Sequence, residues 1–362
     1  MTRSRSRIKP ATFDAAKLLG WYEAHARVLP WRVVPAARRR GMRPDPYAVW
    51  LSEIMLQQTT VATVRGYFET FVSRWPTVAA LAAAQRDDVL AAWAGLGYYA
   101  RARNLHAYAQ AVVREHGGQF PRTAAGLADL PGVGPYTAAA IAAICFDEEI
   151  AVVDGNVERV TARVLALTKP VREAKDEIRA AVQESVPARA GDFAQAMMDL
   201  GATVCTPKSP RCLVCPLNEN CAARASGNPM AFPVGVPKAE RPRRYGHAFV
   251  IERGDGAVWL TRRPERGLLA AMSGVPGGEW RASSAAPDFP MGAKWREAGT
   301  ITHVFTHFAL TLTVWHAQVG NGPEGDGWWS RRARLADEAL PTLYRKVLTE
   351  AGIELRPAKR RA

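Results

Sequence analysis

Four of the five cysteines of this chain lie in one short segment with the spacing C-x6-C-x2-C-x5-C. Four thiolates in one loop can close around a zinc ion or a [4Fe–4S] cluster. Zinc sites usually contain two short C-x-x-C pairs, and this loop contains one, so its wider first gap favours the cluster. Lys208 and Arg211 add positive charge to the loop. The four ligands would be Cys205, Cys212, Cys215 and Cys221.

A glycine-rich segment, Leu130-Pro-Gly-Val-Gly-Pro-Tyr136, lies between two stretches with helical apolar spacing. Gly132 and Gly134 allow a tight turn, and N–H groups at the start of the next helix can bind a phosphate without reading base sequence. This is the pattern of a helix–hairpin–helix. An isolated Gly-Val-Gly would equally fit an ordinary turn between helices, but the surrounding Leu-Pro and the flanking helices favour the motif.

Two carboxylates are candidates for acid–base chemistry. Asp154 precedes a helical segment, where the helix dipole favours its ionised form. Glu53 has apolar neighbours that would raise its pKa enough to keep a proton near neutrality. The simpler alternatives are a helix cap for Asp154 and an exposed position on an amphipathic helix for Glu53.

Helices must position most of these residues. Apolar spacing typical of helices recurs from residue 13 to about 225, as in segments 100–116 and 136–146. Asp45-Pro46 supplies a cap and a first-turn proline for the helix that would carry Glu53. Residues 33–43, which contain Arg38-Arg-Arg40, are expected to form an exposed basic loop with no role beyond attraction of phosphate.

The second part of the chain has a different character. Residues 226–244 are rich in proline and basic residues, which is typical of a linker. The segments that follow are rich in Thr, Val and aromatic residues and predict a smaller α+β domain. We expect a hairpin with strands at 245–252 and 257–262, one or two strands within 301–319, and a helix at 340–351.

Composition limits the class of protein. The 362 residues fit two or three domains. Lys and Arg outnumber Asp and Glu by 48 to 34, a net charge of +14 that points to a polyanionic partner such as nucleic acid. No apolar run approaches the roughly 20 residues of a membrane-spanning helix. The basic N-terminus has no apolar core of a secretory signal, which favours a bacterial cytoplasmic, nucleoid-associated protein.

The hairpin, Asp154 and the cysteine loop, in this order, resemble the endonuclease III superfamily of base-excision DNA glycosylases. Five further segments resemble the adenine DNA glycosylase branch of this superfamily. They are Leu29–Arg32, Glu53–Thr59, Gly95–Arg101, Val153–Asn156 and Gln195–Gly201. The resemblance implies a multidomain α plus α+β protein. Its expected parts are a basic arm (1–12), an all-helical glycosylase domain (13–225) with the helix–hairpin–helix at about 123–146 and the cluster loop at 205–221, the linker (226–244), a Nudix-like α+β recognition domain (245–352) and a basic tail (353–362).

The resemblance also implies a reaction on double-stranded DNA. A monomer with one [4Fe–4S] cluster would hydrolyse the N-glycosidic bond of adenine paired with 8-oxoguanine or guanine. Glu53 would protonate the adenine, Asp154 would stabilise the oxocarbenium-like sugar, and Asn156 would orient Asp154 or the water. Tyr136 stands where bifunctional relatives carry a Schiff-base lysine, which implies a monofunctional enzyme, and its hydroxyl would assist at the sugar.

The remaining implied residues would contact the DNA. The adenine pocket would contain Arg27, Trp31 and Gln195. Gln58, Leu96 and Tyr98 would wedge into the duplex beside the opposite base. Phosphates would be bound by the hairpin glycines, Lys208 and Arg211. Phe305, Thr306 and His307 would read the opposite base, although Phe-Thr-His taken alone fits an ordinary strand; the branch often has serine at the Thr306 position.

Three rival functions stay open at this point. The first is a non-catalytic protein that binds damaged DNA, which the presence of both Glu53 and Asp154 disfavours. The second is a bifunctional glycosylase/lyase like endonuclease III, which Tyr136 disfavours. The third is nucleotide hydrolysis by the C-terminal half, which is disfavoured because the Nudix catalytic signature is absent and Gly277-Gly-Glu279 matches it poorly. That half is therefore expected to recognise and not to hydrolyse.

Overall fold

The computed structural model describes residues 13–236 and 240–355. The predicted basic arm (1–12), three residues of the predicted linker (237–239) and most of the predicted tail (356–362) lie outside the described residues. The chain divides into two compact units. One unit is Met1–Ala82 with Ala107–Pro237, and the other is Ala83–His106 with Lys238–Ala362.

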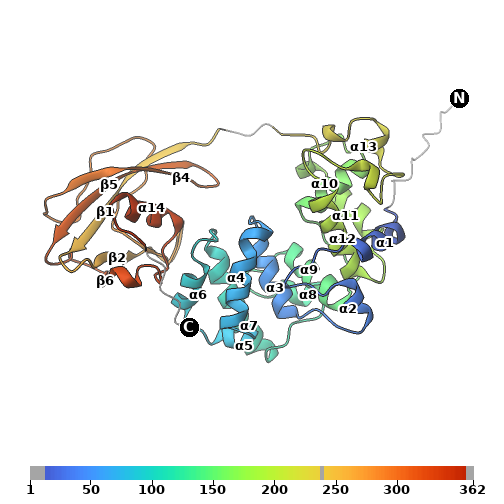
Figure 1. The fold of residues 1–362 in the computed structure, drawn as a ribbon, viewed down its shortest axis with the longest axis horizontal. Helices are drawn as coiled ribbons and strands as arrows, with labels where there is room; N and C mark the ends of the chain where they lie inside the picture. Colours follow the sequence, from blue (N-terminus) through green and yellow to red (C-terminus); the bar gives the residue numbers. More distant parts are fainter. Residues whose placement is uncertain (1–12, 237–239, 356–362) are drawn as a thin grey trace. The chain divides into compact units, whose positions relative to one another are not determined.

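Helices build the first unit (Figure 1). They are α1 (Ala15–His25), α2 (Pro35–Arg39), α3 (Pro46–Leu56), α4 (Val61–Arg74), α5 (Val78–Ala82), α8 (Ala124–Ala128), α9 (Pro135–Phe146), α10 (Gly155–Val164), α11 (Lys175–Gln183), α12 (Ala190–Thr203) and α13 (Ala222–Ala225). Short 3-10 turns are η1 (Val171–Glu173), η2 (Cys212–Val214) and η3 (Pro229–Ala231). Helix α7 (Ala100–His116) crosses the boundary between the units.

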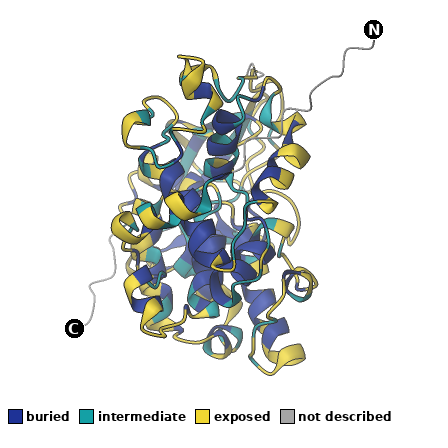
Figure 2. Cartoon of the chain, turned by 90° about the vertical axis from the view of Figure 1, so that its right-hand side faces the viewer, coloured by how far each residue is buried: buried dark blue, intermediate teal, exposed yellow. Residues whose placement is uncertain are grey.

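Two buried helices form the centre of this unit. Helix α9 is buried continuously from Thr137 to Cys145, and α12 from Ala190 to Gly201. The Ala-rich sequence of α9 is apolar on all sides, and such a helix must be buried on all sides. The two helices pack against each other, and α1, α3 and α10 pack around them. Figure 2 shows the buried inner helices in dark blue. Cys145 is a core residue, as predicted.

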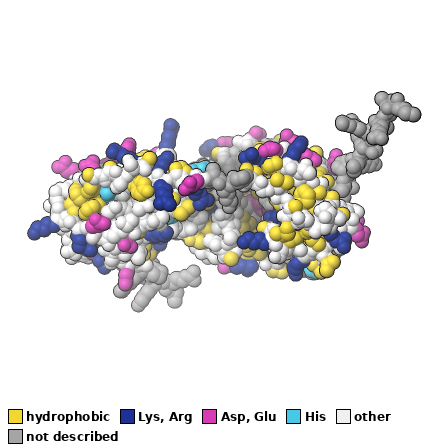
Figure 3. Space-filling view, turned by 90° about the horizontal axis from the view of Figure 1, so that it is seen from above, with side chains coloured by type: hydrophobic (Ala, Val, Ile, Leu, Met, Phe, Trp, Pro, Cys, Tyr) yellow, Lys and Arg dark blue, Asp and Glu magenta, His cyan; other side chains and the backbone are white. Residues whose placement is uncertain are grey.

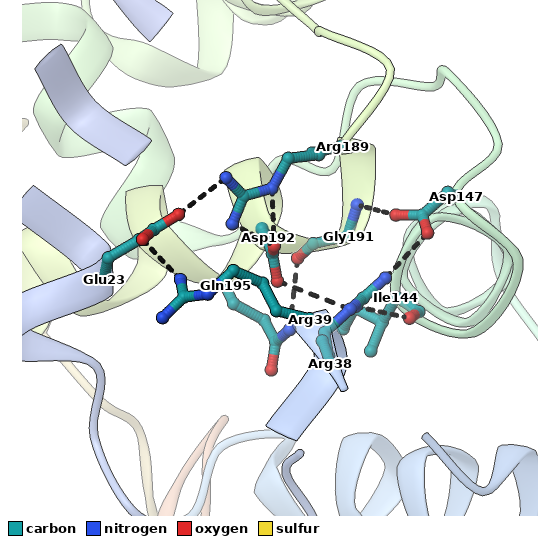
Figure 4. A network of polar contacts seen from close by, with 9 residues as sticks. All are labelled: Glu23, Arg38, Arg39, Ile144, Asp147, Arg189, Gly191, Asp192 and Gln195. Atoms are coloured by element: carbon teal, nitrogen blue, oxygen red, sulfur yellow. Dashed lines mark hydrogen bonds and ion pairs between the residues drawn. The ribbon is translucent and has the colours of Figure 1, made fainter. Parts of the chain in front are cut away.

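The prediction of an exposed basic loop at residues 33–43 was wrong for residues 35–39, whereas residues 40–43 are exposed and lie outside any helix, as predicted. Residues 35–39 form α2, and Arg38 is only 8% exposed. Its Nη2 donates to Oδ2 of Asp147 at 2.7 Å, and its Nη1 donates to the carbonyl of Ile144 at 3.1 Å (Figure 4). Nε of Arg38 is 3.5 Å from Oδ1 of Asp192. Arg38 therefore joins the end of α9 to the start of α12.

The physical reason for this correction is charge pairing. A buried guanidinium is stable only where anionic or carbonyl oxygens satisfy it. Asp147 occupies the left-handed C-cap of α9, where it also accepts a hydrogen bond from the backbone N–H of Gly191 at 3.0 Å. In the same network, Arg39 and Arg189 both pair with Glu23 of α1 (Figure 4). Residues 35–39 thus connect α1, α9 and α12 through Arg38 and Arg39.

A mixed sheet dominates the second unit. Its strands are β1 (Arg243–Arg253), β2 (Val258–Arg262), β3 (Ser273–Gly274), β4 (Arg296–Val304), β5 (Ala309–Val319) and β6 (Trp328–Ser330). The strand order is β3-β2-β1-β5-β4, with β6 paired to β2; β1 and β5 are parallel and the other pairs antiparallel. Helix α14 (Thr342–Glu350) packs against β4 and β1, and η4 spans Arg332–Arg334.

The predicted elements of this unit are confirmed. The turn Arg253–Gly256 joins β1 to β2, with Glu252 opposite Val258. Segment 301–319 contributes to two strands, β4 and β5, joined by a tight connection. Residues 83–106 belong to the same unit and contain α6 (Arg86–Trp93), whose Asp87 accepts two hydrogen bonds from Arg262 at 2.9 and 2.7 Å.

On one face of the molecule the positive charge is not gathered at a single point (Figure 3). On the face in Figure 3, Lys and Arg side chains are spread over the molecule and alternate with Asp and Glu. Among the described residues, no helix is long and apolar enough to cross a membrane.

Candidate active site

A cleft of about 850 Å3 in the first unit brings together seven of the residues predicted from the sequence. They come from four separate parts of the chain: the loop after α1, helix α3 with the turn that follows it, the start of α9, and the start of α10. The seven residues are Arg27, Trp31, Glu53, Gln58, Tyr136, Asp154 and Asn156. Both predicted catalytic carboxylates therefore face the same cavity.

Glu53 lies on α3 and is 8% exposed, so the alternative of an exposed amphipathic position is wrong. The hydroxyl of Tyr136 donates to Oε2 of Glu53 at 2.8 Å. Burial, together with the charge of Asp154, raises the pKa of Glu53 to about 7, although the Tyr136 hydrogen bond and Arg32 act in the opposite direction. In a large fraction of the molecules Glu53 is therefore protonated at neutral pH. The apolar neighbours of Glu53 in the sequence predicted this raised pKa.

Asp154 is the N-cap of α10, as the simpler alternative predicted, and it also lines the cleft; its catalytic role stays a prediction. Its Oδ1 accepts the backbone N–H of Val157 at 2.7 Å, and its Oδ2 accepts Nδ2 of Asn156 at 2.8 Å. These bonds hold the carboxylate in one orientation. Gly201 of α12 makes this packing possible, because a Cβ at that position would lie 2.6 Å from Cβ of Asn156.

Arg159 connects this loop to the cysteine loop. Its Nη2 donates to Oδ1 of Asn156 at 3.0 Å and to the carbonyl of Gly201 at 2.7 Å, and its Nε donates to the carbonyl of Cys205 at 2.9 Å. One guanidinium thus fixes Asn156 against the first residue of the cysteine loop. The sequence analysis did not identify Arg159, and only its position one turn into α10 could have suggested the role.

The four clustered cysteines all line one cavity beside α10 and α12. Arg163, which is 2% exposed, donates to Sγ of Cys205 at 3.3 Å and to the carbonyls of Thr206 and Pro207 at 2.7 and 3.0 Å. Four sulfur donors around one cavity, next to a buried cation that offsets their charge, fit an iron–sulfur cluster. When bound, such a cluster cross-links the loop through its four thiolates; the loop's own bonds to Arg163 hold it against α10.

Asp199 is a site residue that the sequence analysis missed. It is fully buried on α12, where its Oδ1 accepts Nε of Arg27 at 2.6 Å and Nη1 of Arg32 at 2.7 Å. Its Oδ2 accepts the backbone N–H of Arg27 at 2.9 Å. One buried carboxylate therefore holds two arginines of the cleft. The available signal was an acidic residue inside the apolar run Ala196–Leu200, which requires a cationic partner.

The predicted pocket residues Trp31 and Gln195 differ in position. Trp31 is 6% exposed, lines the cleft, and packs edge-on against Phe68 with ring centroids 5.2 Å apart. Gln195 is buried within α12, where its Nε2 donates to the carbonyl of Gly191 at 3.1 Å. It is not among the residues that line the cleft.

The predicted wedge residues have unusual backbone conformations. Gln58 and Tyr98 are in the left-handed region, with φ of 55° and 49°. Residues other than glycine adopt this region at a cost of about 1 kcal/mol or more, and such positions are frequent at functional sites. Gln58 lines the cleft and is exposed, and Tyr98 is 46% exposed in the second unit. Leu96 is buried, at 5% exposure.

The predicted phosphate contacts are exposed. Gly132, with φ of 78°, turns the chain between α8 and α9, and Gly134 is the N-cap of α9. Lys208 lies exposed on the cysteine loop. Arg211 is exposed as well, but its Nη2 donates to the carbonyl of Thr203 at 2.7 Å and ties the loop to α12. Their contacts with DNA stay predictions.

The predicted reading loop is the tip of the β4–β5 hairpin. The backbone N–H of Phe305 donates to the carbonyl of Phe308 at 2.8 Å, so Thr306 and His307 form the two-residue turn. Both are exposed, and Phe305 is partly buried. Oγ1 of Thr306 donates to the hydroxyl of Tyr98 at 3.2 Å, which places two of the predicted opposite-base residues together.

Comparison with known families agrees with this arrangement. Residues 51–188 match the family model of the HhH-GPD superfamily of base excision DNA repair proteins, and residues 205–221 match the iron-sulfur binding domain of endonuclease III. Residues 247–350 match a NUDIX domain. These matches confirm the predicted helix–hairpin–helix glycosylase fold, the iron–sulfur loop and the Nudix-like C-terminal domain.

Relatives with curated names cover nearly the whole chain. The adenine DNA glycosylase of Homo sapiens is 36% identical over 94% of this chain and 74% of its own length. That of Buchnera aphidicola subsp. Schizaphis graminum is 32% identical over 91% and 96%. A solved structure of a thermostable thymine-DNA glycosylase superposes with a TM-score of 0.51 and 26% identity, covering 59% of this chain and 95% of that one.

The cleft, the cysteine loop and the relatives lead to the same conclusion. An acid whose pKa is about 7 and a fixed carboxylate line the same cleft, an arrangement that suits the hydrolysis of an N-glycosidic bond. An iron–sulfur loop and a Nudix-like domain accompany this site in one chain. The chain belongs to the adenine DNA glycosylases, base-excision repair enzymes that act on DNA and hydrolyse the N-glycosidic bond.

Proposed function

We propose that this enzyme removes adenine paired with 8-oxoguanine, and also adenine paired with guanine, and leaves an intact strand with an abasic site. The observation that carries the proposal is the pairing of Glu53 and Asp154 in one cleft, with the pKa of Glu53 raised to about 7. The two carboxyls can then hold different protonation states at the same pH, which is how one site supplies an acid and an anion.

Each residue has a separate task in this reaction. The protonated Glu53 gives its proton to a ring nitrogen of the extruded adenine, so that the base leaves as a neutral molecule. The C1′–N9 bond breaks, and positive charge develops at the sugar opposite the Asp154 carboxylate. Water then adds to C1′ and gives a proton to the Glu53 carboxylate, which restores the acid. Asn156, bonded to Oδ2 of Asp154 at 2.8 Å, keeps that carboxylate aimed at the sugar.

The monofunctional outcome is supported by the residues available as nucleophiles. Strand cleavage by a glycosylase/lyase requires an amine that forms a Schiff base with the sugar. None of the described residues that line the cleft is a lysine. Tyr136 donates its hydroxyl to Glu53, and burial and the charges of Glu53 and Asp154 raise its pKa well above the ordinary value, so it stays a neutral phenol.

Selection of the mispair is assigned to the second unit. Adenine is a normal base, so the lesion must be recognised on the opposite strand. The turn residues Thr306 and His307 present a hydroxyl and an imidazole at an exposed hairpin tip. Such groups can hydrogen bond the C8 carbonyl and N7–H that distinguish 8-oxoguanine, and each good contact contributes about 1–3 kcal/mol of discrimination.

The remaining parts of the proposal concern the cofactor and the state of the enzyme. We assign one [4Fe–4S] cluster to Cys205, Cys212, Cys215 and Cys221, supported by four thiols around one cavity. The enzyme would act as a monomer in a bacterial cytoplasm, associated with the nucleoid.

A single-turnover assay tests the proposal. Duplexes carrying A opposite 8-oxoguanine, guanine or thymine are incubated with the protein, and free adenine, intact abasic strand and cleaved strand are measured separately. We expect adenine release from the first two duplexes without strand cleavage. Glu53→Gln and Asp154→Asn should abolish release while retaining duplex binding, whereas Glu184→Gln, a substitution at an exposed position, should match the unaltered enzyme.

Three results would reject the proposal or a part of it. Trapping of a covalent DNA complex by borohydride would assign a lyase reaction. Near-normal release by either carboxylate variant would remove the role given to that residue. Tight binding of the duplexes without any base release would identify a damage-binding protein instead.

A further inference from the structure

The hairpin tip that carries Thr306 and His307 rests on an aromatic cluster in the second unit. Phe305 and Phe308 close the turn, and their ring centroids are 4.9 Å apart. The ring of Trp280 stacks on Phe305 at 5.6 Å with an interplanar angle of 24°, and it also contacts Phe308 at 6.2 Å. His303 packs edge-on against Phe305 at 4.6 Å. Phe305 is therefore packed on several sides although only partly buried, and the two turn residues beside it are exposed.

Trp280 itself is held by the sheet. The next residue, Arg281, exchanges two backbone hydrogen bonds with Tyr245 of β1, at 2.8 and 2.9 Å. Gly246 of β1 leaves the space for the indole, because a Cβ at that position would lie 2.8 Å from Cδ1 of Trp280. A side chain at this position of the strand would have to displace the indole, so the glycine has a steric function here.

Arg263 completes the cluster on the side of Trp280. Its guanidinium lies 5.5 Å from the centre of the Trp280 ring, in a cation–π arrangement. The backbone of the same arginine is tied to the domain core, because its N–H donates to the carbonyl of the buried residue Met272 at 2.9 Å. The indole is thus fixed between an arginine anchored in the domain core and the ring of Phe305.

We propose that Trp280, seated in the space left by Gly246, is a positioning residue that sets the hairpin tip in the conformation that distinguishes 8-oxoguanine from guanine. This inference rests on the proposed role of Thr306 and His307. Hydrogen-bond discrimination requires the donor and acceptor to be placed within a few tenths of an ångström. Thr306 has one side-chain hydrogen bond, to Tyr98, and the other described contacts at this turn are those of Phe305 and Phe308, so the stack beneath the turn supplies much of that precision.

The chain offers a matched control at another place in the same sheet. Trp329 of β6 packs edge-on against Trp259 of β2 at 5.3 Å, and Arg253 lies 4.8 Å from the centre of its ring. This cluster also consists of aromatic rings and one arginine. Among the described residues, no contact joins it to the hairpin tip. Trp329→Leu therefore reports the general effect of losing such a cluster.

The experiment measures the ratio of single-turnover excision rates on A:8-oxoguanine and A:guanine duplexes at subsaturating enzyme. We expect Trp280→Leu to lower this ratio at least about fivefold, equivalent to about 1 kcal/mol of discrimination at 1.4 kcal/mol per factor of ten. Gly246→Ala should lower it in the same direction, because the added methyl displaces the indole. Trp280→Phe, which keeps a stacking ring, should retain most of the ratio, and Trp329→Leu should leave it unchanged.

The variant Thr306→Ala separates the two levels of the proposal. If Thr306→Ala lowers the ratio and Trp280→Leu does not, the positioning role is wrong and the reading role stands. If neither changes the ratio, the hairpin tip does not read the opposite base. If Trp329→Leu lowers the ratio as much as Trp280→Leu, the effect is one of general stability, and the positioning role is rejected; thermal unfolding of both variants is recorded alongside.

Discussion

The hydroxyl of Tyr136 lies 2.8 Å from Oε2 of Glu53, and this contact joins the first turn of α9 to the acid on α3. The hydrogen bond lowers the pKa of Glu53, while burial and the charge of Asp154 raise it, and the result is a value of about 7. The tyrosine thus limits how far burial can raise the pKa of the acid. It keeps that pKa near neutrality.

The first prediction concerns pH dependence. Since Glu53 acts in its protonated form and its pKa is about 7, the single-turnover rate should be highest below pH 7 and fall about tenfold per unit well above it. Tyr136→Phe removes a hydrogen bond that lowers this pKa, so the falling limb should move to higher pH. Rate profiles between about pH 5 and pH 9, with duplex binding measured at each pH, test both statements. A limb that moves to lower pH in Tyr136→Phe would contradict the assignment.

The second prediction is that Glu53→Gln stabilises the folded enzyme at alkaline pH. The pKa of Glu53 rises from 4.5 to about 7 on folding, so the unfolded chain releases this proton at lower pH. Below about pH 4.5, Glu53 has no effect on the pH dependence of the free energy of unfolding. That free energy falls as the pH rises to about 7, and above this pH it stays lower by about 3 kcal/mol. A neutral amide at this position carries no such penalty. Denaturant unfolding should show a clear gain in Glu53→Gln at about pH 8 and a much smaller one at about pH 5; equal differences at both values would refute the explanation.

The third prediction tests the buried carboxylate of Asp199. Its removal leaves Arg27 and Arg32 without their shared partner, and breaking a buried ion pair typically costs about 3–5 kcal/mol. Asp199→Ala should therefore be strongly destabilised in urea, and it should lose adenine excision as the wall of the cleft rearranges. The control is Asp255→Ala, which breaks the exposed pair with Arg253 and should unfold like the unaltered enzyme. Equal stability of the two variants would show that Asp199 is not a structural anchor.

The fourth prediction separates two roles for the basic segment 33–43: binding of phosphate and stabilisation of the fold. Arg38 is buried against Asp147 and Ile144, so Arg38→Ala should lower the free energy of unfolding by about 3 kcal/mol or more. Arg40 is exposed, and Arg40→Ala should leave stability unchanged. The slope of the logarithm of the binding constant against the logarithm of salt concentration reports the number of phosphate contacts. Neither substitution should change this slope by more than about one contact. A large reduction of that slope in Arg38→Ala, with normal stability, would restore the phosphate-binding interpretation.

The fifth prediction concerns the cysteine loop. The purified protein should be brown, absorb broadly in the near-visible range, and contain about four iron atoms per chain. Cys212→Ser should reduce the iron content, whereas Cys145→Ala, which changes a core cysteine outside the loop, should retain it. Stoichiometric zinc without iron would overturn the assignment.

The sequence by itself determined the local features of this protein. The spacing of four cysteines identified an iron–sulfur loop, the Leu-Pro-Gly-Val-Gly segment identified the turn between α8 and α9, and the strand-like segments around Arg253–Gly256 identified the β1–β2 hairpin. The apolar neighbours of Glu53 also predicted its raised pKa. These properties depend on residues that are close together in the chain, so the sequence alone is enough to predict them.

Only the tertiary structure decided which charges are paired. Three consecutive arginines indicate an exposed loop, yet Arg38 is buried because Asp147 lies against it from the end of α9, 109 positions away. Asp199 looks like an isolated charge in an apolar helix until Arg27 and Arg32 reach it from positions 172 and 167 residues earlier in the chain. A buried charge is stable only when an oppositely charged or polar partner lies next to it in space. The order of residues in the chain does not show which segments the packing of α1, α9 and α12 brings together.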